Sequence, residues 1–221
     1  MAGGLSWGIR FRDGSGLRPL EPVLRNWIKT VEEYTNAFEE DACWSYTERA
    51  NVGVLAGAAW RTKGWLALEE YSTSKRCVQG QPRNGRCDLY LLNKDEEGMS
   101  FAFEAKQTRQ NMGKRVSQNL NRLDAQFTEA WRDAGQLHRS EGDKRVAACF
   151  VMPRMPLKEV DTVDEALDSW LNDVQKQVEY DALAWVFPEE ARRFQGRKAR
   201  VSPGVVLVMQ ERQRATRAKK V

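Results

Sequence analysis

The chain contains a single histidine, His138, among its 221 residues. One histidine excludes sites that require several, such as histidine-metal nucleases and histidine triads. The four cysteines, Cys43, Cys77, Cys87 and Cys149, are scattered and include no Cys-x-x-Cys pair. A zinc site of cysteines and histidines is therefore not expected. The thiols are expected to be reduced, as in a cytoplasmic protein.

The sequence also lacks a long apolar segment. No apolar run approaches the ~20 residues of a membrane-spanning helix, and residues 1–16 lack the apolar core of a signal peptide. Hydrophobic residues make up 41% of the chain and charged residues 30%, which is typical of a folded, soluble protein. We expect a cytoplasmic protein without membrane contact that folds as one domain over residues 1–221.

Positive charge is concentrated near the C-terminus. The net charge is +4, but residues 191–220 hold ten Lys and Arg against the single acid Glu211, a local charge of +9 that leaves −5 elsewhere. This asymmetry favours a polyanionic partner, nucleic acid in preference to a membrane surface. Residues 1–19 are expected to form an irregular lead-in with a short strand at 7–11, and residues 211–221 a basic tail.

The most informative segment spans residues 85–107. Its apolar residues predict two strands, at 86–92 and 100–107, joined by a turn in which charges and turn formers cluster. Because side chains alternate across a strand, Glu104 and Lys106 share one face, and Phe101, Phe103 and Ala105 the other. The hairpin can bring Asp88 alongside Glu104 and Lys106.

Two carboxylates and an ammonium among apolar neighbours need partners. Adjacent carboxylates repel one another, and a divalent cation relieves that repulsion while supplying Lewis acidity. The alternative is a cross-strand pair between the lysine and a carboxylate on a solvated face of the sheet.

An Asp, a turn and then Glu-Ala-Lys at the end of an apolar strand resembles the PD-(D/E)XK nuclease superfamily, the restriction-endonuclease-like proteins. The motif matches Asp88, Glu104 and Lys106 over about twenty residues, with Cys87 where the superfamily's name has Pro. The resemblance implies an α/β fold with an αβββαβ core, in which helices flank a mixed central sheet. It also implies hydrolysis of phosphodiester bonds with Mg²⁺ or Mn²⁺, held by Asp88, Glu104 and the carbonyl of Ala105. Lys106 would orient water, help deprotonate it or stabilise charge on phosphorus.

The rest of the chain fits this order of elements. Hydrophobic periodicity predicts four helices, at residues 20–38, 41–63, 114–139 and 161–180. It predicts further strands at 65–73, 145–152, 182–187 and 204–209, with a polar, basic loop at 74–85. The segment from 41 to 152 thus reads helix, three strands, helix, strand.

A further acid is expected from the second helix. Glu48 lies on the same stripe as Trp44, Val52 and Leu55, and in the superfamily the helix before the sheet often contributes an acid to the metal site. Glu69 and Glu70 are the substitutes for this role. The structural alternative is an ion pair between Glu48 and an arginine.

Phosphate contacts are expected from basic residues near the motif and in the last loop. The nearer group comprises Arg109, Lys114 and Arg115, of which the last two would lie at a helix N-terminus. The farther group comprises Arg192, Arg193, Arg197, Lys198 and Arg200. The expected substrate is DNA, although the sequence also allows RNA. It does not distinguish endonuclease from exonuclease action, a monomer from a homodimer, or roles in restriction, repair, recombination and phage defence. Two other classes stay open: a non-catalytic nucleic-acid-binding protein on the same fold, and an interaction protein whose basic tail binds an acidic partner.

Overall fold

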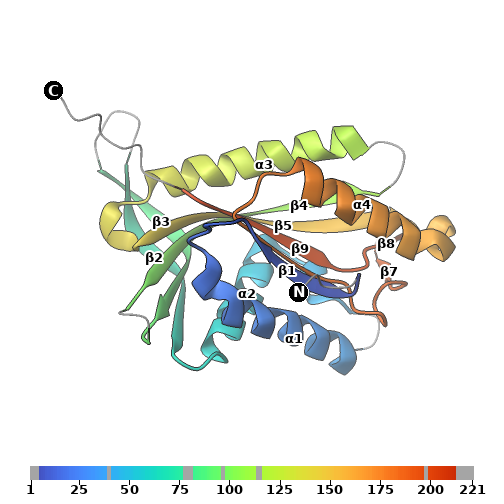
Figure 1. Cartoon of the computed structure of the whole chain (residues 1–221), viewed down its shortest axis with the longest axis horizontal. Helices are drawn as coiled ribbons and strands as arrows, with labels where there is room; N and C mark the ends of the chain where they lie inside the picture. Colours follow the sequence, from blue (N-terminus) through green and yellow to red (C-terminus); the bar gives the residue numbers. More distant parts are fainter. Residues whose placement is uncertain are drawn as a thin grey trace.

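The computed structural model describes residues 5–38, 41–76, 82–95, 98–112, 116–196 and 199–212. It is a mixed α/β structure in which one curled sheet is flanked by helices (Figure 1). The helices are α1 (Glu21–Ala37), α2 (Glu48–Trp60), α3 (Val116–Gln136) and α4 (Val163–Gln177). The main strands are β1 (Trp7–Phe11), β2 (Trp65–Arg76), β3 (Pro82–Asn93), β4 (Ser100–Asn111), β5 (Lys144–Pro156), β6 (Ala182–Val186) and β9 (Val205–Glu211). Two short strands, β7 (Gln195–Gly196) and β8 (Arg200–Val201), pair with one another, and β8 also pairs with β5.

The strand order is β1-β6-β9-β5-β4-β3-β2. Strands β2, β3 and β4 form an antiparallel meander, and α3 then crosses over so that β5 lies parallel to β4. The β2–β3 pairing runs from Trp65 opposite Asn93 to Arg76 opposite Pro82, whereas β3 pairs with β4 only over Leu89–Leu92. The β2–β3 pair therefore diverges from β4 just before Leu89.

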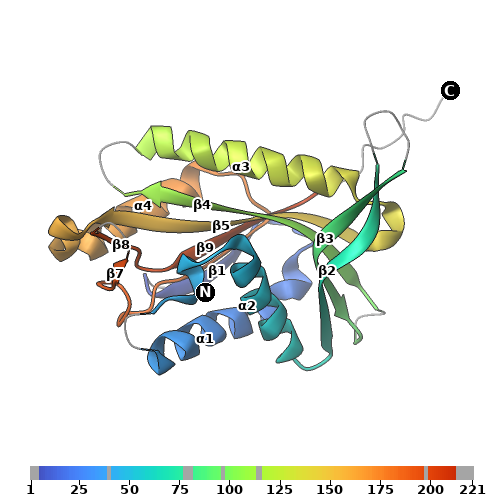
Figure 2. The ribbon, with the colours of Figure 1, turned by 180° about the vertical axis from the view of Figure 1, so that it is seen from behind.

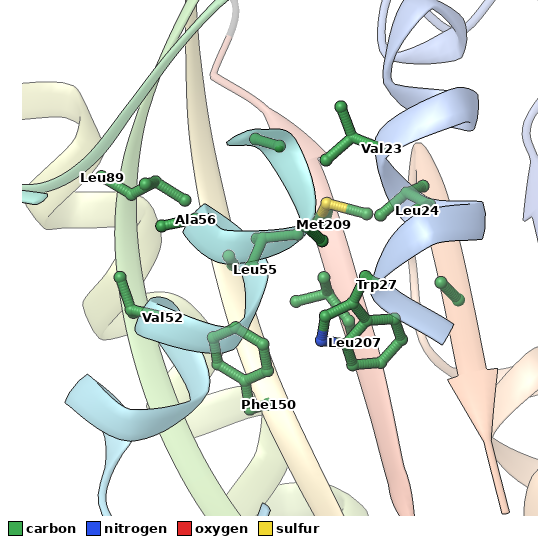
Figure 3. Close-up of a cluster of buried hydrophobic side chains, with 14 of the residues drawn as sticks. Val23, Leu24, Trp27, Val52, Leu55, Ala56, Leu89, Phe150, Leu207 and Met209 are labelled. Carbon is green, nitrogen blue, oxygen red and sulfur yellow. The ribbon is translucent and has the colours of Figure 1, made fainter. Parts of the chain in front are cut away.

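Two cores lie on opposite faces of the sheet. In Figure 1, α3 and α4 lie on one side of the sheet and α1 and α2 on the other; Figure 2 shows α2 between α1 and the β2–β3 pair. Trp27 and Leu55 pack against Phe150 and Leu207 on the α1–α2 side (Figure 3). On the α3–α4 side, Trp170 and other buried residues cover the opposite face of β5, β6 and β9. Both faces of the central strands are thus buried, as their nearly continuous apolar sequences suggest.

The start of α2 differs from the prediction of a helix over residues 41–63. A 3₁₀ turn at Cys43–Ser45 comes first, and α2 begins at Glu48. The Thr47 side chain accepts a hydrogen bond from Ala50 N at 3.3 Å, as an N-cap residue does. Buried Trp44 therefore lies outside the helix, and Glu48 is the first residue of α2 rather than part of a stripe along it.

The predicted loop at 74–85 is shorter than expected. Strand β2 continues to Arg76 and β3 begins at Pro82, so Lys75 and Gly85 are strand residues. The short strand at 7–11 is confirmed, and the other helices and strands agree with the predictions to within a few residues. None of the helices in the described ranges has the length and apolar character needed to cross a membrane.

Candidate active site

The motif residues meet where β3 separates from β4. Asp88 is the residue just before the β3–β4 pairing, which begins at Leu89, and its Oδ2 accepts a hydrogen bond from the backbone N–H of Ala105 at 2.7 Å. The carboxylate thus satisfies an N–H group of β4 that β3 no longer reaches. Because the N–H and C=O of one strand residue point to the same side, the carbonyl of Ala105 also faces the Asp88 side.

Glu104 is the most buried acid of this group, with 2% of its surface exposed. Its Oε1 lies 2.7 Å from the Lys75 ammonium, an ion pair, and accepts no regular hydrogen bond from the described residues. Burial, and next the charge of Asp88, raise the pKa of Glu104 to about 7, despite the opposing effect of Lys75. The site therefore holds a carboxylate whose ionisation is only partly compensated.

Lys106 lies on the same face of β4 and points toward α3. Its ammonium is 3.3 Å from Asp133 Oδ2. Burial opposes the charged form of Lys106, but attraction to Glu48, Asp133 and Asp88 outweighs burial and raises its pKa. Lys106 is therefore an ammonium at neutral pH. The expected division of faces on β4 is also confirmed, since Phe101, Phe103 and Ala105 belong to the opposite core.

Glu48 joins the cluster from the N-terminus of α2. Burial is the main cause that raises the pKa of Glu48. Attraction to Lys106 lowers the pKa, and repulsion from Asp88, Glu129 and Glu70 raises it. These mutual effects place its carboxylate within electrostatic reach of the motif. The structure thus brings Glu48 to the motif by a different route from the predicted helix stripe.

The two substitutes for Glu48 differ from one another. Glu69 faces α2, where its Oε2 is 3.4 Å from the position a Cβ on Gly53 would take. Glu70 has a φ of 51°, unusual for a residue other than glycine, and is held by Arg49 at 3.1 Å and Arg86 at 3.2 Å. Glu70 also contributes to the raised pKa of Asp88, after burial. Of the two, Glu70 is the one near the motif.

The basic residues expected to contact phosphate near the motif do not line it as closely as the acidic residues do. Arg109 points away from the Lys106 face and donates to the backbone carbonyls of Ser45 at 2.9 Å and Tyr46 at 3.3 Å. The half of α3 that contacts the motif is its C-terminal half, through Asp133. At about 1.5 Å per residue, Val116 lies roughly 25 Å from Asp133 along the helix. The first described turn of α3 is therefore far along the helix from the part that meets the motif, and the basic residues expected before it, Lys114 and Arg115, lie outside the described residues.

The basic residues of the last loop also fall into different classes. Arg192 is largely buried, with 11% of its side chain exposed, and donates to Asp164 at 3.1 Å and Ser6 at 2.7 Å. Arg193 is exposed, and Arg200 donates to Asn111 at 3.1 Å. Four of the predicted contacts lie outside the described residues: Lys114, Arg115, Arg197 and Lys198.

Several charged neighbours of the motif are not among the predicted site residues. The sequence pattern puts Lys75 in a loop, and Glu129 and Asp133 in the interior of a helix with no role in the site. The two acids are four residues apart on α3, flanking buried residues such as Ala130 and Ala134. That i, i+4 spacing of acids at the edge of an apolar stripe is the signal that was available in the sequence.

The described residues contain no group of three or more His, Cys, Asp or Glu side chains arranged to hold a metal ion. The predicted set has two carboxylates and a backbone carbonyl, all hard oxygen donors suited to Mg²⁺ or Mn²⁺. Cys87 offers no competing thiolate, because burial raises its pKa to about 12 and its Sγ is within hydrogen-bonding distance of two backbone carbonyls. No family model, curated protein or solved structure matches the chain.

Proposed function

We propose that this chain hydrolyses phosphodiester bonds of nucleic acid, with DNA as the first substrate, using a divalent cation. One observation carries the proposal: Asp88, Glu104 and Lys106 gather around the backbone of Ala105 where β3 and β4 diverge. The order of elements, α2, β2, β3, β4, α3 and β5, also agrees with the αβββαβ core of the restriction-endonuclease-like fold.

The residues fit a hard divalent cation. Glu104 is buried beside a second carboxylate, and its Oε1 has an ammonium contact but no hydrogen bond within the described chain. Asp88 uses Oδ2 to accept from Ala105, and within the described part of the chain its Oδ1 accepts no hydrogen bond, so that oxygen can face a ligand. Asp88, Glu104 and the Ala105 carbonyl would hold the ion, and Glu48 would add to the shell directly or through water. A bound ion would supply Lewis acidity at the phosphate and lower the pKa of a water molecule.

The protein's own groups define the remaining roles. Because its pKa is raised, Lys106 is suited to stabilise negative charge on the phosphate oxygens rather than to remove a proton at neutral pH. Asp133, 3.3 Å from the ammonium, fixes its position. In the reaction the water oxygen bonds to phosphorus, the P–O ester bond breaks and the leaving oxygen takes a proton.

The test is cleavage of supercoiled DNA, linear DNA and single-stranded RNA in Mg²⁺, in Mn²⁺ and in excess chelator. Asp88→Asn, Glu104→Gln and Lys106→Met keep side-chain volume and remove the charge. Each should lower the rate at least about 100-fold, and chelator should abolish cleavage. Glu165→Gln, an exposed acid on α4, is the matched control and should cleave at the wild-type rate.

Activity that persists in all three variants would refute the assignment to this site. Salt-sensitive DNA binding with no cleavage in any metal would establish instead the non-catalytic binding protein on the same fold. A protein that neither binds nor cleaves nucleic acid would instead favour the third class, an interaction protein whose basic tail binds an acidic partner. The circular substrate separates endonuclease from exonuclease action, because only the former cuts DNA without ends.

A further inference from the structure

We propose that Lys75 pairs with Glu104 in the metal-free protein and is displaced when a divalent cation binds, so that Lys75 weakens and thereby sets the metal affinity of the site. The inference rests on the proposed function, because it requires a cation at Glu104. Lys75 lies on β2, outside the Asp and Glu-Ala-Lys motif.

The ammonium of Lys75 lies where a cation would bind. Its Nζ is 2.7 Å from Oε1 of Glu104, and the two side chains are 18% and 3% exposed. Divalent ions take carboxylate oxygens at about 2.0–2.6 Å, so an ion on that oxygen would meet the ammonium. Two positive charges at such a separation in a poorly solvated site repel strongly.

The path of the Lys75 side chain depends on Gly85 in β3. A Cβ added at Gly85 would come 2.8 Å from Cδ of Lys75 and 2.9 Å from its Cγ, so the methylenes lie directly over the glycine. The neighbouring pairs, Thr73 with Gly85 and Ser74 with Asn84, are regular antiparallel register. The space above Gly85 therefore lets the lysine reach inward to Glu104.

Of the two lysines near Glu104, Lys75 is the one free to leave. Lys106 forms its ion pair with Asp133, whose Oδ2 lies 3.3 Å from the ammonium. Among the described residues, Lys75 forms its ion pair with Glu104. Lys75 also lies in the part of the β2–β3 pair that is not paired with β4. Breaking the ion pair with Glu104 would release the ammonium toward solvent or an incoming phosphate.

The experiment measures Mn²⁺ binding by calorimetry without nucleic acid, at pH 8, above the pKa of about 7 of Glu104. Lys75→Met removes the ammonium at similar volume, and should bind Mn²⁺ about tenfold more tightly or better than wild type. Gly85→Ala keeps the ammonium but obstructs its path, and should shift affinity in the same direction by less. Lys94→Met, at an exposed lysine in the β3–β4 turn, is the control and should bind as wild type.

A second readout is the melting temperature. Lys75→Met without metal should melt below wild type, because Glu104 loses its counter-charge, and Mn²⁺ should stabilise this variant more than it stabilises wild type. Equal or weaker Mn²⁺ binding by Lys75→Met, with clear binding by wild type, would overturn the inference and leave the proposed function intact. Absence of Mn²⁺ binding in every protein, wild type included, would overturn the proposed function itself. If Lys75→Met does not fold, Gly85→Ala decides by the same criteria.

Discussion

Glu104→Gln should change how the free energy of unfolding depends on pH. Burial raises the pKa of Glu104 from 4.5 to about 7. Between these values the folded state holds a proton that the unfolded state has released, so stability falls as pH rises. The contribution is complete below pH ~4.5 and lost above pH ~7. A pKa difference of about 2.5 corresponds to about 3 kcal/mol. Glutamine does not titrate, so the variant should keep this contribution at pH 8.

The assay is urea unfolding between pH 4.5 and 8 in excess chelator, with the variant and wild type compared at each pH. Other groups titrate in both proteins, so the difference between the two curves isolates Glu104. Glu33→Gln is the control: Glu33 is exposed, and the hydrogen bond from Arg61 lowers its pKa, so its curve should run parallel to wild type across this range. Parallel curves for Glu104→Gln and wild type would show that Glu104 is not desolvated, and the electrostatic description of the site would be wrong.

Three further predictions concern the surroundings of the site. Gly204→Ala should lower stability by about 3 kcal/mol or more in urea unfolding, because the added methyl group would overlap the backbone carbonyl of Val186. Arg192→Ala should lower stability by about 1–3 kcal/mol because its largely buried guanidinium donates hydrogen bonds to Asp164 and Ser6, whereas exposed Arg193→Ala should keep the melting temperature and reduce the salt dependence of DNA binding. Deleting residues 213–221 should leave the melting temperature nearly unchanged and reduce the slope of log K against log salt by up to about 0.9 for each phosphate that the tail neutralises; an unchanged slope would show that the tail is not used in binding.

The sequence predicts the hairpin well, because apolar alternation and a polar turn are local signals. It places Glu104 and Lys106 on one face of β4 and Asp88 nearby for the same reason. The predicted start of α2 is wrong because the apolar spacing of Trp44 continues the helical stripe, while the capping threonine that decides the boundary is a weaker signal. The helix itself is predicted correctly, but the stripe through Trp44 and Val52 places Glu48 in its interior, whereas Glu48 is the first residue of α2.

The partners of the motif could not be predicted in the same way. Lys75 lies among serine, arginine and glycine residues typical of a loop, and only the register of β2 against β3 makes it a strand residue that reaches Glu104. Asp133 meets Lys106 across the crossover between β4 and α3. Such contacts depend on strand register and helix placement, which periodicity within one segment does not determine.

The hydrogen bond from Ala105 to Asp88 also makes one amide proton a reporter of the whole site. An N–H that donates to a carboxylate is charge-assisted, so its resonance should move when Asp88 loses charge or gains a ligand. Nuclear magnetic resonance of the Ala105 amide could then follow protonation, metal titration and nucleic-acid binding at an atom that takes no part in the chemistry. Its hydrogen-exchange rate would report separately how often the hydrogen bond between Ala105 and the Asp88 carboxylate opens. Assignment of this one backbone resonance would therefore give access to both the chemical shift and the hydrogen-exchange rate.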